Sequence, residues 1–149
     1  MSLEGINRAC VTFDARSENE GFARMVVMGF MMEMNPTVDE LQDVKTAVSE
    51  AVTNAIIHGY EGKENEQVEM TCVREGQNLV VIVEDHGIGI KNLEEALQPF
   101  YTTKPEEERS GMGFSFMETF MDEVAVVSEV GKGTRVTMKK YIEKEYSDK

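Results

Sequence analysis

The stretch that decides the fold is Glu50-Ala-Val-Thr-Asn54-Ala-Ile-Ile-His58, in the first half of the 149-residue chain. Its apolar residues predict a buried helix, while Glu50, Asn54 and His58 recur every four positions. Side chains four apart lie on one face of an α-helix, so these three form a single polar stripe. Such a stripe is typical either of a solvated helix edge or of a binding site, and the helix alone favours neither.

The chemistry of this stripe suits phosphate and metal. The Asn54 oxygen is a hard ligand of the kind that Mg²⁺ takes while it keeps waters and phosphate oxygens around it. Glu50, one turn earlier, is positioned to accept a proton from an attacking hydroxyl. A site for a metal-bound phosphate is therefore the alternative to a solvated edge.

The patterns on either side of the stretch predict an α+β fold. Alternating or continuous apolar runs indicate strands at 7–13, 67–74, 78–84, 124–129 and 135–140. Helical patterns cover 18–34, 37–58 and 111–121. This order predicts a two-layer sandwich, a mixed or antiparallel sheet with helices on one face, in a single domain over 6–141. Residues 1–5 are expected to be a tag or a disordered N-terminus, and 142–149 a polar tail.

The sequence contains capping motifs at two predicted helix starts and a terminating glycine at one predicted helix end. Ser17 with Glu20, and Thr37 with Glu40, match the capping box, in which each side chain satisfies a free backbone amide of the other residue. Gly59 follows the second helix, where a left-handed residue commonly ends a helix. We therefore expect two capping boxes and a left-handed Gly59.

A second motif, Asp85-His-Gly87-Ile-Gly89, follows the most apolar strand. An aspartate at the end of a buried strand requires hydrogen-bond donors, and the exocyclic amine of adenine is one. Gly87 and Gly89 allow a flat base to approach the backbone. A plain turn at the end of a strand has the same sequence, so the motif alone is weak.

The third motif is Ser110-Gly-Met-Gly113-Phe114. It lies at the end of a long irregular segment, 85–110, which is typical of a lid. The two glycines stand at the start of a predicted helix, whose free backbone N–H groups can bind phosphate oxygens. Hydroxyl and basic side chains precede the glycines in the sequence. An ordinary solvated lysine remains the alternative for Lys104. The candidate phosphate-binding residues are Thr102, Thr103, Lys104, Arg109, Ser110, Gly111, Met112, Gly113 and Phe114.

The net charge of −13 restricts the ligands. Binding of nucleic acid draws on clustered Lys and Arg, so this balance argues against it. A polyanion such as ATP also requires imported positive charge, which a metal and a few local basic residues would provide.

Taken together, the three motifs resemble the N, G1 and G2 boxes of the GHKL ATPase and kinase superfamily, which has the Bergerat nucleotide-binding fold. The stretches 15–20, 49–60 and 102–114 are more specific and resemble the family of sporulation anti-sigma F factors. The resemblance covers roughly residues 6–141. It implies a cytoplasmic homodimer that binds the sporulation sigma factor F and phosphorylates a serine of an anti-anti-sigma protein.

The resemblance also implies roles for individual residues. Asn54 would hold Mg²⁺, Glu50 would be the catalytic base and Asp85 would recognise adenine. Gly111 and Gly113 would bind phosphates, and Thr134 would lie near the adenine pocket. Two positions depart from the common pattern of the superfamily, since His86 is often Glu and Ser115 replaces a third glycine.

The two histidines, His58 and His86, both lie inside nucleotide motifs, which favours a serine kinase over a histidine kinase. Two other functions remain open. One is the related anti-sigma kinase of the general stress response, and the other is a module that binds ATP and sequesters a partner without transferring phosphate.

The first predicted helix is apolar almost all round. Between Phe22 and Met32 only Arg24 and Gly29 interrupt the apolar run. The helix is therefore either buried on two sides or exposes part of its surface to a partner. In the second case Arg24 is a candidate anchor for an acidic group.

Overall fold

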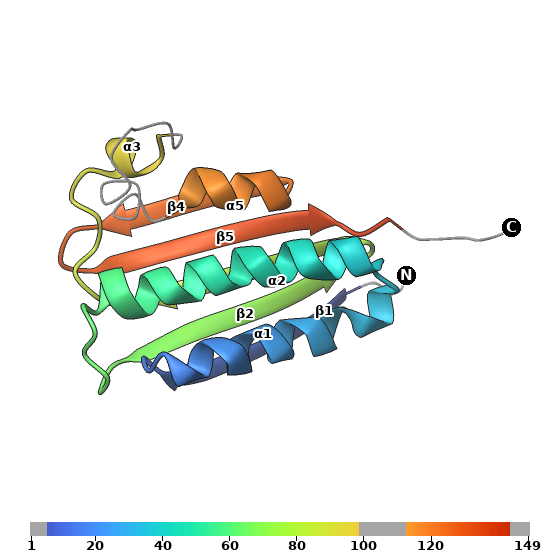
Figure 1. Ribbon diagram of the computed structural model, residues 1–149, viewed down its shortest axis with the longest axis horizontal. Helices are drawn as coiled ribbons and strands as arrows, with labels where there is room; N and C mark the ends of the chain where they lie inside the picture. The colour runs from blue at the N-terminus through green and yellow to red at the C-terminus, as the bar shows by residue number, and fades with distance from the viewer. Residues whose placement is uncertain (1–5, 99–112, 144–149) are drawn as a thin grey trace, which may run out of the picture.

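A five-stranded antiparallel sheet forms one layer of the molecule (Figure 1). The computed structural model describes residues 6–98 and 113–143. The sheet order is β1-β2-β3-β5-β4, and each neighbouring pair is antiparallel. The strands are β1 Ile6–Asp14, β2 Gln67–Glu75, β3 Asn78–Asp85, β4 Glu123–Glu129 and β5 Gly133–Tyr141.

Helices cover one face of this sheet, with α2 packed between α1 and α5 (Figure 1). The helical elements are α1 Glu18–Met31, the 3-10 turn η1 Met32–Met34, α2 Val38–Thr53, the π-helical turn η2 Asn54–Gly59, α3 Leu93–Ala96 and α5 Phe114–Phe120. The predicted α+β sandwich with helices on one face is confirmed. None of the helices in the described ranges has the length and apolarity needed to span a bilayer.

Alternation along the strands places the core between sheet and helices. Met70 pairs with Val83, and Val83 with Val136, to form one of the buried rows that cross the sheet. The same alternation along β3 buries residues 79, 81, 83 and 85, while 80, 82 and 84 stay partly exposed. Asp85 is therefore turned toward the helices because it occupies the last inward position of an otherwise apolar strand.

One of the two predicted capping boxes is present. The Thr37 hydroxyl accepts from the Glu40 amide at 3.1 Å, and the Glu40 carboxylate accepts from the Thr37 amide at 2.9 Å. The prediction for Ser17 is wrong, since Ser17 has helical backbone angles and no capping bond from its side chain. The Glu20 carboxylate instead accepts a hydrogen bond from Ser49 and pairs with Arg24 at 2.7 Å. Tertiary contacts between α1 and α2 thus outweigh the local motif.

The prediction of a left-handed Gly59 is also wrong. The chain continues from α2 into η2, and positive φ appears only after it, at Glu61 (55°) and Gly62 (81°). A different constraint explains the glycine. A β-carbon at position 59 would lie 2.6 Å from the carboxyl carbon of Asp85. Gly59 is therefore required by close packing and not by backbone conformation.

Candidate functional site

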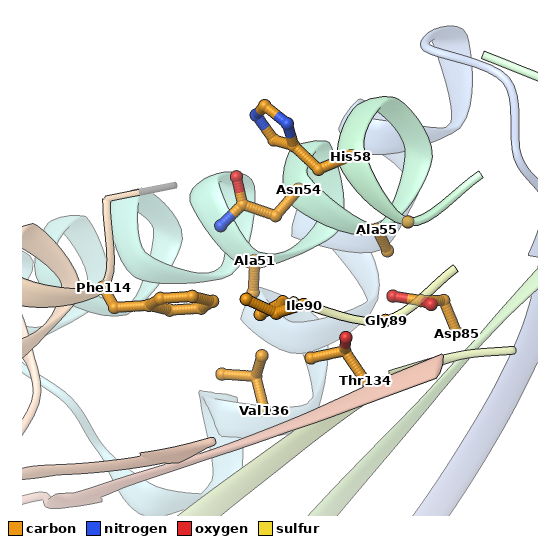
Figure 2. A pocket seen from close by; sticks show the side chains of 11 residues that line it. Ala51, Asn54, Ala55, His58, Asp85, Gly89, Ile90, Phe114, Thr134 and Val136 are labelled. Carbon is orange, nitrogen blue, oxygen red and sulfur yellow. The ribbon is translucent and has the colours of Figure 1, made fainter. Parts of the chain in front are cut away.

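A pocket opens where the end of α2, the end of β3, the start of α5 and the start of β5 meet (Figure 2). It brings together residues from all three sequence motifs. The lining residues are Ala51, Asn54, Ala55, His58, Gly59, Asp85, Gly89, Ile90, Phe114, Thr134 and Val136.

The helical wall of the pocket carries the polar stripe. Asn54 and His58 project from the same side of the helix in Figure 2, and both line the pocket. They lie in the π-helical turn η2, a distortion that is frequent at functional sites because it reorients side chains. Burial lowers the pKa of His58, so this imidazole is held neutral at physiological pH.

Glu50, one turn earlier, faces a different neighbour. Its carboxylate lies against Gly113, the residue that precedes α5, where an added β-carbon would be 2.8 Å from the Glu50 Oε1 atom. Gly113 also has a left-handed φ of 67°. Burial raises the pKa of Glu50. The first and third motifs are therefore in contact, through the Glu50 carboxylate and Gly113.

Asp85 lies at the end of the pocket away from Phe114 (Figure 2). The Asp85 residue is 6% exposed. Its Oδ1 atom accepts a hydrogen bond from the Gly87 amide at 2.9 Å. Burial raises the pKa of Asp85, while hydrogen bonds from the Gly87 and Thr134 amides oppose the rise. A buried carboxylate with few donors gains from a ligand that brings an N–H group.

Close backbone contacts hold the Asp85 turn in place. The Ile88 amide donates to the Gly59 carbonyl at 2.9 Å. A β-carbon at Gly87 would lie 1.8 Å from the same carbonyl oxygen, so only glycine fits there. Gly89 adopts a φ of 78° and packs against the backbone of Glu129. The turn is therefore fixed between η2 on one side and the β4–β5 connection on the other.

Two residues that support the site escaped the sequence analysis. The Tyr60 hydroxyl donates to the Gln67 carbonyl and accepts from the His86 amide, both at 2.7 Å. The Ser128 hydroxyl contacts Thr134 at 2.8 Å. The His86 side chain itself is exposed, in line with a minor role for this departure from the family pattern.

Part of the predicted phosphate-binding segment lies outside the described residues. Phe114 is buried and lines the pocket, and Gly113 contacts Glu50. The remaining candidates stay predictions, namely Thr102, Thr103, Lys104, Arg109, Ser110, Gly111 and Met112.

The donor set of the pocket suits a metal that arrives with its ligand. Within the described residues, no group of three or more His, Cys, Asp or Glu side chains is arranged to hold a metal ion. Asn54 supplies one neutral oxygen in the pocket wall. Mg²⁺ commonly uses only one or two protein ligands and completes its shell with phosphate oxygens and waters, so the residues present fit this mode.

Comparisons with known proteins agree with this geometry. The family described as Histidine kinase-like ATPase domain matches residues 13–140. The anti-sigma F factor of Clostridium kluyveri is 58% identical over 134 residues, which cover 90% of this chain and 94% of the relative. The chain belongs to the anti-sigma F factor family. The factor of Geobacillus thermodenitrificans is 56% identical over 138 residues, covering 93% of this chain and 94% of the relative.

Solved structures share the fold of this anti-sigma F family member. The RsbU and RsbW domains of Rv1364c from Mycobacterium tuberculosis match with a TM-score of 0.65 at 18% identity, covering 91% of this chain and 32% of that one. The catalytic domain of histidine kinase ThkA matches with a TM-score of 0.56 at 17% identity, covering 90% of this chain and 98% of that one. At these identities the likeness establishes the fold alone.

We expect Gly59→Ala to weaken ATP binding by about tenfold, because the new β-carbon would displace the Asp85 carboxylate. Calorimetric titration with ATP and Mg²⁺ measures this loss. Gly29→Ala is the matched control, since a β-carbon at this α1 position meets nothing within 4 Å. The control should keep wild-type affinity and gain about 0.5–1 kcal/mol of stability. Wild-type affinity in Gly59→Ala would show that the Asp85 carboxylate does not contact the nucleotide.

Proposed function

We propose that this protein binds and inhibits the sporulation sigma factor F and, as an ATP-dependent serine kinase, phosphorylates and inactivates an anti-anti-sigma protein. One observation carries the proposal. Asp85 and Asn54 line one pocket, and the partly buried Glu50 lies one helical turn before Asn54, against Gly113. The names of the relatives support sigma factor F over the general stress response.

In this proposal the nucleotide lies along the pocket. Asp85 accepts a hydrogen bond from the exocyclic amine of adenine, while Gly87 and Gly89 allow the base to approach. Asn54 holds Mg²⁺, which neutralises charge on the phosphates. Gly111 and Gly113 contact the phosphates, assisted by the hydroxyls and positive charge of 102–110. His58, kept neutral by its burial, adds a polar contact without a second positive charge.

Glu50 serves as the general base in the transfer. The serine oxygen forms a bond to the γ-phosphorus, the bond from that phosphorus to the β,γ-bridging oxygen breaks, ADP leaves, and the serine proton passes to Glu50. A raised pKa makes Glu50 a better proton acceptor as long as it remains ionised. Its deprotonated form predominates above that pKa, so the rate should fall as the pH falls through it.

The first helix supplies a surface for a protein partner. Its buried stripe is narrow and consists of Ala23, Val27 and Met31. Met25 is 67% exposed, and Phe22 and Met32 are also exposed on α1 and η1. Burial on two sides therefore does not describe this helix. A second copy of the chain, the sigma factor and the anti-anti-sigma protein are the partners we propose, and all are expected in the cytoplasm.

Arg24 interrupts this apolar run in the sequence, and its partner Glu20 also bonds Ser49 of α2. The Arg24 Nε atom pairs with the Glu20 carboxylate at 2.7 Å, and the Arg24 side chain is 37% exposed. The pairing with Glu20 orients the guanidinium without covering it. An acidic group on a partner is then the natural ligand for the remaining N–H donors.

We expect Glu50→Gln to lower phosphate transfer by about 10²- to 10⁴-fold while ATP and sigma-factor binding persist. The measurement is incorporation of label from ATP into the anti-anti-sigma protein with Mg²⁺. Glu75→Gln, at the exposed end of β2, is the matched control and should transfer at the wild-type rate. Transfer at the wild-type rate by Glu50→Gln would refute the assigned base. A wild type that binds ATP and the sigma factor without any transfer would instead indicate a sequestering module.

We expect Arg24→Ala to weaken binding of the sigma factor or the anti-anti-sigma protein by at least about tenfold, with ATP affinity unchanged. Arg16→Ala is the control, because Arg16 also pairs with glutamates but lies outside the exposed apolar run of α1. Surface plasmon resonance with each partner provides the comparison. If both partners bind Arg24→Ala as tightly as they bind wild type, Arg24 is not an anchor.

A further inference from the structure

Ser128, on the edge strand β4, joins the adenine end of the pocket to its surroundings. Its Oγ atom accepts a hydrogen bond from the Ile90 amide at 2.8 Å. The same hydroxyl donates to the Gly133 carbonyl at 3.2 Å and lies 2.8 Å from the Thr134 Oγ1 atom. Ile90 and Thr134 both line the pocket, whereas Ser128 does not.

Either hydroxyl of the Ser128–Thr134 pair could donate, and the donation from Ser128 to the Gly133 carbonyl selects the direction. A serine hydroxyl has one proton to donate and two lone pairs to accept with. The Gly133 carbonyl can only accept, so it takes the Ser128 proton. The hydrogen bond between the two hydroxyls then requires Thr134 to donate to Ser128. With its proton committed, Thr134 has only lone pairs left for the pocket.

The donation from Thr134 to Ser128 determines which ligand groups can form hydrogen bonds with this wall of the pocket. In Figure 2 the Thr134 hydroxyl oxygen lies beside the Asp85 carboxylate at the same end of the pocket. Both groups are then hydrogen-bond acceptors. An amino group at position 6 of a purine meets them with N–H donors, whereas a 6-oxo group brings a third acceptor, which can pair with neither of them.

We infer that Ser128 is a positioning residue for base selection, which holds the Thr134 hydroxyl as an acceptor and so favours 6-amino over 6-oxo purine nucleotides. The inference rests on the proposed nucleotide site. Without the Ser128 hydroxyl, the Thr134 hydroxyl is free to rotate and to donate into the pocket, where it would pair with a 6-oxo group.

The test compares affinities for ATP and inosine triphosphate, which differ at positions 6 and 1 of the purine. We expect wild type to prefer ATP by about 100-fold, as sites built around a hydrogen bond do. Ser128→Ala should shrink this preference by about tenfold, since Thr134 can then pair with the 6-oxo group. Ser128→Thr keeps the hydroxyl and should restore the wild-type preference. Thr137→Val is the control, because it removes a β5 hydroxyl from the opposite face of the sheet and should leave the preference unchanged.

A double variant separates positioning from general damage. If Ser128 acts through Thr134, adding Ser128→Ala to Thr134→Val should not change the preference further. A wild-type preference in Ser128→Ala, a reduced one in Ser128→Thr, or an additional loss in the double variant would overturn the inference. Failure of the wild type to bind either nucleotide would refute the proposed site itself, and the inference with it.

Discussion

The burial of the Asp85 carboxylate at the end of β3 is the constraint on which the rest of the site depends. Asp85 occupies the last inward position of β3, whose other inward residues are apolar, so its side chain faces the helices. Gly59 and Gly87 leave room for it and for the turn that follows, and the Tyr60 hydroxyl binds that turn at the His86 amide. Folding thus holds an acceptor ready for a ligand, at the expense of its hydration.

Electrostatics requires a polyanionic ligand of this pocket to be accompanied by positive charge. The described part of the pocket is lined by no lysine or arginine, and the whole chain carries a net charge of −13. Burial raises the pKa of Asp85, which lines the pocket, and of Glu50, which lies against Gly113. A triphosphate in this site needs positive charge from Mg²⁺ and from basic residues such as Lys104 and Arg109, whose placement lies outside the described ranges.

The sequence predicted the layers of the fold and the convergence of its motifs, because both follow from local patterns. Alternation located the strands, and the Thr37 capping box marked the start of α2. The Ser17 box failed because the Glu20 carboxylate instead pairs with Ser49 of α2 and Arg24 of α1. Gly59 was misread because its neighbour, Asp85, is 26 residues away. Tyr60 and Ser128 carry no motif, since their roles come only from tertiary hydrogen bonds.

The central claim is that one pocket binds the adenine at Asp85 and the metal-bound phosphates at Asn54. A crystal structure of the protein with a non-hydrolysable ATP analogue and Mg²⁺ tests it most directly. The account predicts the exocyclic amine of adenine within hydrogen-bond distance of the Asp85 carboxylate, and the Asn54 oxygen in the coordination shell of Mg²⁺. A nucleotide bound elsewhere, or a metal held without Asn54, would contradict it.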